Sequence, residues 1–418
     1  MFPDAMDVHL RKRGRVKATR KGGNRAGAAM PRNSPVAEAQ GTGEQVGKSL
    51  MQVMAIADIH PFSDTLKEWE RGVPVKCGRD WSAKAIRLAI KKGPHRSAMT
   101  PEAIELVHED VDYQVKASFS QVVHWEDIKY NLPSNFKLLP LAVVPQEGRR
   151  GRIILDLSFP SRRLSQGGRK RKMGPVVEEL VNDSTETLGP QIAVKLLGTV
   201  LPRMFQFMEE FPLQEEIMLS KIDLPDGFWR MIVSDEDRWN FCYMMPDPLG
   251  SPLRIVVPPA LQIGWCKSPA YFASATETGR EIIELLLNAK VELPPQRAED
   301  YMEPEIPAKL QKSDDGKWRS INVYIDDYCL AAVENATGTL LRRISRSALH
   351  TIHSIFPPPD VLGQKGGKDS ILQKKLERGD ARWETEKSFS GFSLTARNAR
   401  FACPNRRHEQ SQRSSPRS

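Results

Sequence analysis

The chain of 418 residues has little cysteine, and its cysteines are not paired along the sequence. The five are scattered, with no Cys-x-x-Cys pair and no flanking histidine pattern: Cys77, Cys242, Cys266, Cys329 and Cys403. A zinc site needs clustered thiolate and imidazole ligands, and a disulfide framework needs many cysteines in a short secreted chain. The scattering argues against both kinds of site and favours a reducing compartment.

Long apolar runs are also missing. No stretch approaches the ~20 apolar residues that a membrane-spanning helix needs. The first thirty residues are basic and glycine-rich, without the apolar segment of a secretory signal. We therefore expect no membrane association and an intracellular location, cytoplasmic, nuclear or both, rather than secretion. Hydrophobic residues still make up 40% of the chain, enough for a sizeable core in two or three domains.

Negative charge is outnumbered by positive charge. The formal net charge is +9 and the isoelectric point is near 9.2, which is typical of a polyanion-binding protein. Residues 1–50 combine many lysines and arginines with Gly, Ala and Ser, so they are predicted to form a disordered basic leader that could also hold phosphates or serve in nuclear import. Residues 162–173 are predicted to be an exposed basic loop, and the polar residues 393–418 a disordered tail.

The secondary-structure pattern between these segments is mixed. Residues 51–135 have a helical pattern, and Pro101 is expected at the first position of one helix. Ser268 and Pro269 predict the start of a long helix to about Asn288, with the serine as its cap. Strands are predicted at residues 141–144, 152–157, 217–224, 239–245 and 253–257, a loop insertion at 290–320, and a last helix at 339–356.

Asp326 and Asp327 stand between two apolar, β-prone runs. This pattern predicts a hairpin with the two carboxylates at its tip. Two like charges at a tight turn cost free energy unless a cation shares them, so a divalent metal ion is the natural complement. The alternative is that the pair forms only a turn, as we expect for Asp314 and Asp315 in a polar stretch.

Asp223 ends another apolar strand, about 100 residues before this hairpin. If the strands lie side by side in one antiparallel sheet, Asp223 and Asp326 face each other and can hold two divalent ions. Two ions suit in-line phosphoryl transfer, because one activates the attacking oxygen and the other stabilises the leaving oxygen. The alternative role of Asp223 is to cap the Pro-Asp-Gly turn that follows it.

Four sequence blocks occur in a fixed order over residues 138–330. They are Leu141-Ala-Val-Val-Pro145 with Arg152-Ile-Ile-Leu-Asp156, Ser220-Lys-Ile-Asp223-Leu-Pro-Asp-Gly-Phe228-Trp-Arg, Leu261-Gln-Ile-Gly264-Trp-Cys-Lys-Ser268-Pro269, and Tyr324-Ile-Asp326-Asp327. In this order and spacing, the blocks resemble the fingers hairpin and the three palm motifs of a retroelement reverse transcriptase.

The resemblance implies roles for individual residues. Asp223 and Asp326 would be catalytic ligands of two Mg²⁺ ions, or of Mn²⁺, with Asp327 supporting the same metal site. Arg152 would contact the incoming triphosphate. The aromatic ring of Phe228 would exclude a sugar 2′-hydroxyl, unless it merely packs in the core.

Two further residues would lie close to nucleic acid. Gly264 would let the backbone approach the templating base pair, where a side chain would collide. Tyr324 would lie near the primer end.

The resemblance also implies a function. It is RNA-directed DNA polymerisation by a retrotransposon enzyme that uses an RNA template, a DNA primer and dNTP. The first alternative is an inactive remnant that only binds nucleic acid, through the basic leader and residues 162–173. The second is an RNA-directed RNA polymerase. The oligomeric state is left open.

The implied fold class is α+β, a right-hand polymerase of fingers and palm with an antiparallel palm sheet backed by helices. The expected division of the chain is a basic leader (1–50), a helical N-terminal region (51–135), a fingers-like region (136–216), a palm (217–356, insertion 290–320), a residual palm–thumb connection (357–392) and a disordered tail (393–418).

The sequence departs from the family pattern in several places. A fingers lysine near the triphosphate has no match, although Arg149 or Arg150 could replace it, and Ile263 stands where relatives carry Gln or Phe. The block usually written Leu-Gly is Ser390-Gly391-Phe392 here. No thumb, protease, integrase, zinc-knuckle or ribonuclease H pattern is recognisable, so we expect a polymerase piece cut out of, or decayed from, a larger polyprotein.

Overall fold

The computed structural model describes twelve stretches of the chain: residues 72–116, 120–159, 180–186, 190–210, 217–248, 250–288, 293–303, 318–333, 340–358, 369–389, 392–395 and 400–402. The predicted leader at 1–50, the basic stretch 162–173, the pair Asp314-Asp315 and the block Ser390-Gly391 lie outside these residues. The predicted domain boundaries stay predictions.

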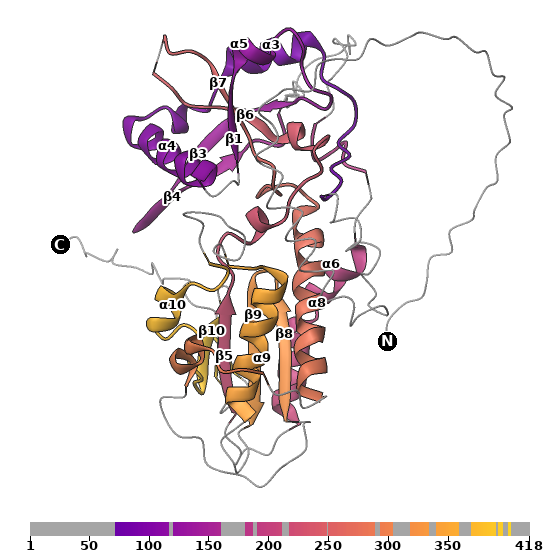
Figure 1. The fold of residues 1–418 in the computed structure, drawn as a ribbon, viewed down its shortest axis with the longest axis vertical. Helices are drawn as coiled ribbons and strands as arrows, with labels where there is room; N and C mark the ends of the chain where they lie inside the picture. Colours follow the sequence, from indigo (N-terminus) through magenta and orange to yellow (C-terminus); the bar gives the residue numbers. More distant parts are fainter. Residues whose placement is uncertain are drawn as a thin grey trace, which may run out of the picture. The chain divides into compact units, whose positions relative to one another are not determined.

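A three-stranded antiparallel sheet carries the two acidic segments singled out in the sequence (Figure 1). Its strand order is β5–β9–β8. The strands are β5 (Ile217–Asp223), β8 (Arg319–Tyr324) and β9 (Asp327–Val333). The predicted hairpin around residues 324–328 is confirmed as β8 and β9, and β5, which is far away in sequence, pairs along the whole length of β9.

Alternate side chains of this sheet enter two different apolar clusters. Met218, Ile222 and Leu330 belong to the large core that includes helices α8 and α9. Leu219 and Ala331 belong to a smaller cluster with helix α7. Both faces of β9 are therefore covered, which explains why all seven of its residues are buried and why its sequence is a continuous apolar run rather than an alternation.

Two long helices pack side by side against this sheet, α8 (Ser268–Asn288) and α9 (Leu340–Ile355) (Figure 1). Both helices are confirmed close to their predicted bounds. The reason for the start of α8 differs from the prediction, because Ser268 is already helical and its hydroxyl donates to the carbonyl of Gln262 at 2.8 Å instead of capping the helix. Helix α9 is amphipathic, and proline follows soon after its end.

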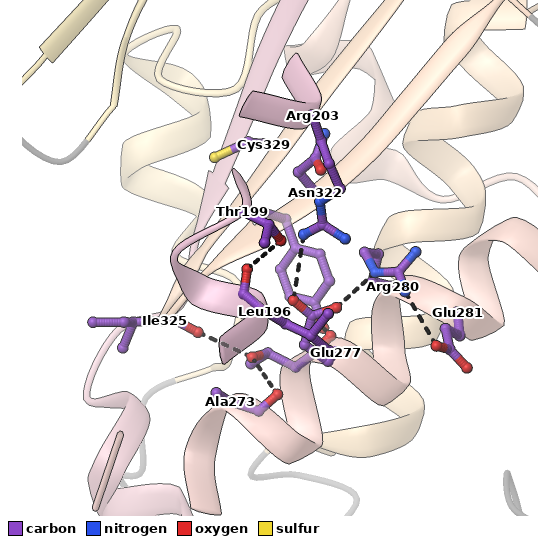
Figure 2. A network of polar contacts seen from close by, with 12 residues as sticks. Leu196, Thr199, Arg203, Ala273, Glu277, Arg280, Glu281, Asn322, Ile325 and Cys329 are labelled. Carbon is purple, nitrogen blue, oxygen red and sulfur yellow. Dashed lines mark hydrogen bonds and ion pairs between the residues drawn. The ribbon is translucent and has the colours of Figure 1, made fainter. Parts of the chain in front are cut away.

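A buried ionic network ties α8 to its neighbours (Figure 2). Glu277 is fully buried, and its carboxylate accepts a hydrogen bond from Arg280 Nε at 2.6 Å. Arg203, on helix α7 (Val200–Glu209), lies 3.6 Å from the other carboxylate oxygen. The desolvation of the Arg203 guanidinium lowers its pKa below the ordinary value, against the opposing charge of Glu277. Burying such charges is tolerable only when they are paired.

The remaining described strands and helices include a hairpin and a mixed sheet. The hairpin, β3 (Leu141–Gln146) with β4 (Arg149–Leu155), confirms the prediction, although both strands extend into the expected turn. The mixed sheet has the order β1–β7–β6–β2. Its strands are β1 (Gln121–His124), β2 (Leu138–Leu139), β6 (Cys242–Met244) and β7 (Arg254–Val257). Helices α3 (Ala83–Lys92) and α5 (Trp125–Ile128) contact this sheet, α4 (Pro101–Lys116) contacts β4, and α6 (Gln191–Leu197) contacts α8.

Three sequence predictions need correction in these regions. The helical region 51–135 also contributes β1, whose short alternation was hidden between helices. The predicted strand 239–245 begins as a 3₁₀ helix, η5 (Arg238–Phe241), before β6. The insertion 290–320 contains the 3₁₀ helix η6 (Arg297–Met302), which buries Met302, and its last residues begin β8.

The expected disordered tail is also partly wrong. Strands β10 (Glu386–Phe389), β11 (Phe392–Thr395) and β12 (Arg400–Ala402) form an antiparallel sheet, preceded by helix α10 (Gln373–Glu377). Phe389 of β10 and Leu394 of β11 are buried in the apolar cluster with α7. These few apolar residues within a polar sequence attach the three-stranded sheet to the rest of the fold. Residues 403–418 lie outside the described part of the chain.

The predicted α+β class, with an antiparallel sheet backed by helices, is confirmed. None of the helices within the described residues is long and apolar enough to cross a membrane.

Candidate functional site

The ends of β5 and β9 bring the acidic residues of two sequence blocks together. In the antiparallel register, Asp223 lies directly opposite Asp327, not opposite Asp326 as the sequence suggested. Asp326 sits one residue further, on the turn, and its carbonyl accepts a hydrogen bond from the amide of Leu224 at 2.9 Å. The hairpin tip is therefore Ile325 and Asp326, while Asp327 is a buried strand residue, 4% exposed.

The turn itself has an unusual backbone. Ile325 adopts φ +57°, in the left-handed region that β-branched residues rarely enter. Two-residue hairpin turns need positive φ at their first central position, and glycine or asparagine usually supplies it. An isoleucine there costs on the order of 1–3 kcal/mol, which the surrounding contacts must offset. Such strain is typical of functional sites, where one side chain must be held in a fixed place.

Two lysines compensate the carboxylates. Lys221, two residues before Asp223 and therefore on the same face of β5, places its Nζ 3.5 Å from Asp327 Oδ1. Lys375, on α10, forms an ion pair with the Oδ2 of Asp223. Like charges directly opposite on neighbouring strands are destabilising. These ammonium groups therefore offset the repulsion between Asp223 and Asp327.

Asp326 has no comparable ion pair among the contacts described above, and its ionisation is disfavoured. Burial is the main cause and the negative charge of Asp327 is the second; together they raise the pKa of Asp326 to about 6, against a weaker lowering by Lys221. A cation that approaches a carboxylate in this environment lowers its free energy, because the cation stabilises the charged form.

The three carboxylates fit a hard divalent cation in their donor chemistry. All donors are oxygens, the ligands that Mg²⁺ and Mn²⁺ accept. As they stand, the described residues contain no group of three His, Cys, Asp or Glu side chains that could hold an ion by themselves. Mg²⁺ is usually held by one or two carboxylates together with waters and substrate phosphates, so a site with two aspartate ligands would match the usual protein contribution.

Phe228 lies next to the first carboxylate strand, on the 3₁₀ helix η4 (Gly227–Arg230). Its half-buried ring meets the ring of Phe272 edge to face, with centroids 5.4 Å apart. A Cβ on Gly227 would approach Phe272 Cζ to 2.5 Å, so only glycine fits between this turn and α8. The packing alternative considered for Phe228 is thus present, and it fixes the position of the ring.

A cavity of about 170 Å³ is lined by residues from several of the other sequence blocks. The exposed Arg152 on β4 lines it, together with Trp229 and Ile263, the neighbours of Phe228 and Gly264. Asp110 and Gln114 of α4 contribute further polar groups to its lining. None of the three carboxylates lines this cavity. The predicted residues therefore fall into two groups, one at the carboxylates and one at the cavity, and not into one pocket.

Gly264, Tyr324 and Arg150 have local roles in the fold. Gly264 adopts φ +98°, which favours glycine, whereas a Cβ there would meet only Leu157 at an ordinary 3.5 Å. Tyr324 is half-buried and pairs with Asp327 across the hairpin. Arg150, proposed above as a substitute for a fingers lysine, contacts Glu109 and the carbonyl of Leu106 on α4.

Sequence reasoning missed both compensating lysines and the helix residue beneath the turn. Lys221 could have been found, because its alternation with Asp223 places both on one face of a strand. The contact of Lys375 had no local signal, since α10 follows a long stretch of sequence and reaches Asp223 only through the tertiary fold. Thr276, whose hydroxyl lies 3.1 Å from the carbonyl of Ile325, was likewise unmarked.

No family model matches the chain, and a comparison with curated proteins found no match. Among solved structures the chain is similar to a foamy viral protease-reverse transcriptase in complex with dsDNA, with 16% identity, a TM-score of 0.40, and coverage of 84% of this chain and 54% of that one. The same foamy viral protein in complex with an RNA/DNA hybrid gives 17% identity, a TM-score of 0.38, and coverage of 84% and 35%.

The chain therefore spans about half or less of these structures. At these TM-scores the similarities assign no role to any residue here.

Proposed function

We propose that this chain is the fingers and palm portion of a retrotransposon reverse transcriptase, an RNA-directed DNA polymerase that uses two Mg²⁺ ions, or Mn²⁺. The observation that carries the proposal is the register of β5 and β9. It sets Asp223 opposite Asp327 and Asp326 on the adjoining turn, three carboxylates from two distant sequence blocks at one edge of a sheet.

The chemistry follows from the carboxylates. Bound divalent ions would supply charge stabilisation for the attacking and leaving oxygens of a nucleotidyl transfer. Asp223 and Asp326 would hold the cations, and Asp327, paired with Lys221, would keep its carboxylate next to them without competing for the same position. The protein then contributes positioning and electrostatics, which is most of what phosphoryl transfer needs.

The substrates follow from the adjoining cavity. Arg152 at its wall offers a planar guanidinium for the triphosphate of an incoming dNTP. Phe228, fixed edge-on by Phe272, would stand against the sugar and exclude a 2′-hydroxyl. An RNA template and a DNA primer would be the nucleic-acid partners, and the net charge of +9 supports binding to such polyanions. The enzyme would act inside the cell.

A second candidate is a silent remnant that only binds nucleic acid. The two ion pairs favour it, because Lys221 and Lys375 already neutralise two of the three carboxylates. In such a remnant, the two ammonium groups would permanently occupy the positions of the metal ions.

Primer extension separates these candidates. The purified full chain would be given an RNA template with a DNA primer, Mg²⁺ or Mn²⁺, and either dNTP or rNTP. The polymerase proposal predicts extension with dNTP and little with rNTP. Extension with rNTP instead would identify an RNA polymerase. No product with either nucleotide, together with RNA binding that weakens steeply as salt rises, would establish the remnant.

A further inference from the structure

One face of α8 touches both turns that carry the candidate carboxylates. Phe272 packs beneath Gly227 and Phe228, just after the Asp223 strand. Thr276, four residues and one helical turn later, lies beneath Ile325. Residues four apart share one side of a helix, so a single rigid element supports both turns from behind.

Thr276 makes a specific contact with the strained turn. Its side chain is fully buried, and its Oγ1 lies 3.1 Å from the carbonyl oxygen of Ile325, nearer than the carbonyls of Ala273 at 3.3 Å and Phe272 at 3.4 Å in its own helix. Figure 2 draws the contacts that end on Ile325 and Ala273. The hydroxyl has one proton, and the Ile325 carbonyl is its shortest acceptor. The contact therefore holds the residue whose backbone is left-handed.

The neighbouring residues keep the helix and the hairpin at this distance. Tyr328, two residues after Asp326, donates from its hydroxyl to the carbonyl of Thr276 at 3.2 Å. A Cβ on Gly279 would come within 2.2 Å of that hydroxyl oxygen, so glycine is needed for the close approach. Hydrogen bonds thus run in both directions between α8 and the hairpin, one on each side of Asp326.

We infer that Thr276 is a positioning residue for the metal-binding turn. By donating to the Ile325 carbonyl, it stabilises the left-handed conformation of the turn that carries Asp326, next to the paired residues Asp223 and Asp327. It touches neither substrate nor metal and acts through the turn. This inference rests on the proposed function for its consequence at the metal site, but the effect on the turn itself can be measured without metal.

The test compares three variants at buried threonines of α8. Thr276→Val keeps the branched shape and removes the donor, and Thr276→Ser keeps the donor. Thr278→Val is the matched control, because its hydroxyl is equally buried and bonds only the carbonyl of Ser274, at 2.7 Å, within the helix. The two valine substitutions are the same chemical change at two buried positions of one helix, so a merely structural role would make these two variants behave alike.

The first readout is amide hydrogen exchange at Leu224, whose N–H bonds the Asp326 carbonyl. Loss of one hydrogen bond predicts exchange about tenfold faster in T276V than in the wild type or T278V, with T276S close to the wild type. Equal exchange in T276V and T278V, or failure of T276S to restore protection, would overturn the inference.

The second readout is the affinity for Mn²⁺ alone, measured by electron paramagnetic resonance. T276V should bind Mn²⁺ about tenfold more weakly than T278V, because the Asp326 carboxylate is less well placed. Equal affinities would refute the role at the metal site. If the wild type binds no Mn²⁺, the proposed function fails instead, and the exchange at Leu224 still decides whether Thr276 holds the turn.

Discussion

Asp326 carries a carboxyl group whose ionisation the fold disfavours. Burial and the charge of Asp327 raise its pKa from 3.8 to about 6. Because the folded-state pKa lies above the unfolded value, the protonated form is favoured by folding. Its contribution to stability is complete below about pH 4 and is lost as the pH rises through 6.

Asp326→Asn should therefore stabilise the metal-free protein, in the presence of a chelator, at pH 7 but not at pH 4. The expected gain in the free energy of unfolding is about 2 kcal/mol at pH 7. Urea unfolding between pH 4 and 7 measures it. Asp235→Asn is the control, because it removes a carboxylate that is 70% exposed. Its ion pair with Arg238 has the carboxylate in solvent, where such pairs contribute little, so the free energy of unfolding should change little at either pH. A gain in D326N that is the same at both pH values would contradict the assigned pKa.

Phe228 gives a second prediction at the scale of one side chain. Its ring is held by Phe272, so replacement by alanine should open space where the sugar 2′-hydroxyl of an rNTP would lie. Phe228→Ala should raise the kcat/KM for GTP relative to dGTP by about tenfold or more, as expected when a steric contact in a pocket is lost. Phe228→Tyr keeps the ring and should keep the preference. An unchanged ratio in F228A would leave the ring with its packing role alone.

At the scale of elements, α8 joins the ionic network to the candidate site. Glu277 is buried between Arg280 and Arg203 (Figure 2). The next residue towards the N-terminus is Thr276. The helix is therefore held both by the buried charges and by the hydrogen bonds to the hairpin. Its rotation about its own axis, which decides where Thr276 points, is set by both.

Glu277→Met should lower the free energy of unfolding by about 3–5 kcal/mol, because it leaves two guanidinium groups without their buried partner. Adding Arg203→Met should recover part of this loss, since one uncompensated charge is then removed. Urea unfolding of the wild type, both single variants and the double variant forms a thermodynamic cycle. Additive losses would show that Glu277 and Arg203 are not coupled.

The sequence was sufficient for elements with a strong local pattern. The long helix at Ser268–Asn288 was predicted from the Ser-Pro pair at its start, and the hairpin from two β-prone runs, 141–144 and 152–157, on either side of a turn. The short strands β11 and β12 were not, because three or four residues in polar surroundings give no clear period. Pairing between distant strands adds a register that local sequence does not determine.

The same limit applies to the candidate site. The residue types were identifiable, since Asp223, Asp326 and Asp327 each stand at the end of an apolar run. Their partners were not, because a shift of one residue in register exchanges Asp326 and Asp327 as the neighbour of Asp223. Lys375 and Thr276 reach the site from helices far along the chain, so only the tertiary fold brings them there.

At the scale of the whole molecule, the excess of positive charge should govern binding to nucleic acid. With a net charge of +9, RNA affinity should fall steeply with salt, by about a thousandfold between 50 and 200 mM if six phosphates are contacted. Fluorescence anisotropy with a labelled RNA–DNA hybrid across this range measures the slope. A flat dependence would mean that phosphate contacts do not carry the binding.

The most direct test of the metal-dependent site is single-nucleotide addition to a DNA primer on an RNA template, with saturating dNTP and Mg²⁺. The wild type and D235N should extend the primer, whereas Asp326→Asn and Asp223→Asn should abolish extension while keeping the wild-type fold by circular dichroism. The account is contradicted if D326N or D223N adds the nucleotide at the wild-type rate, or if the folded wild type adds none with either Mg²⁺ or Mn²⁺.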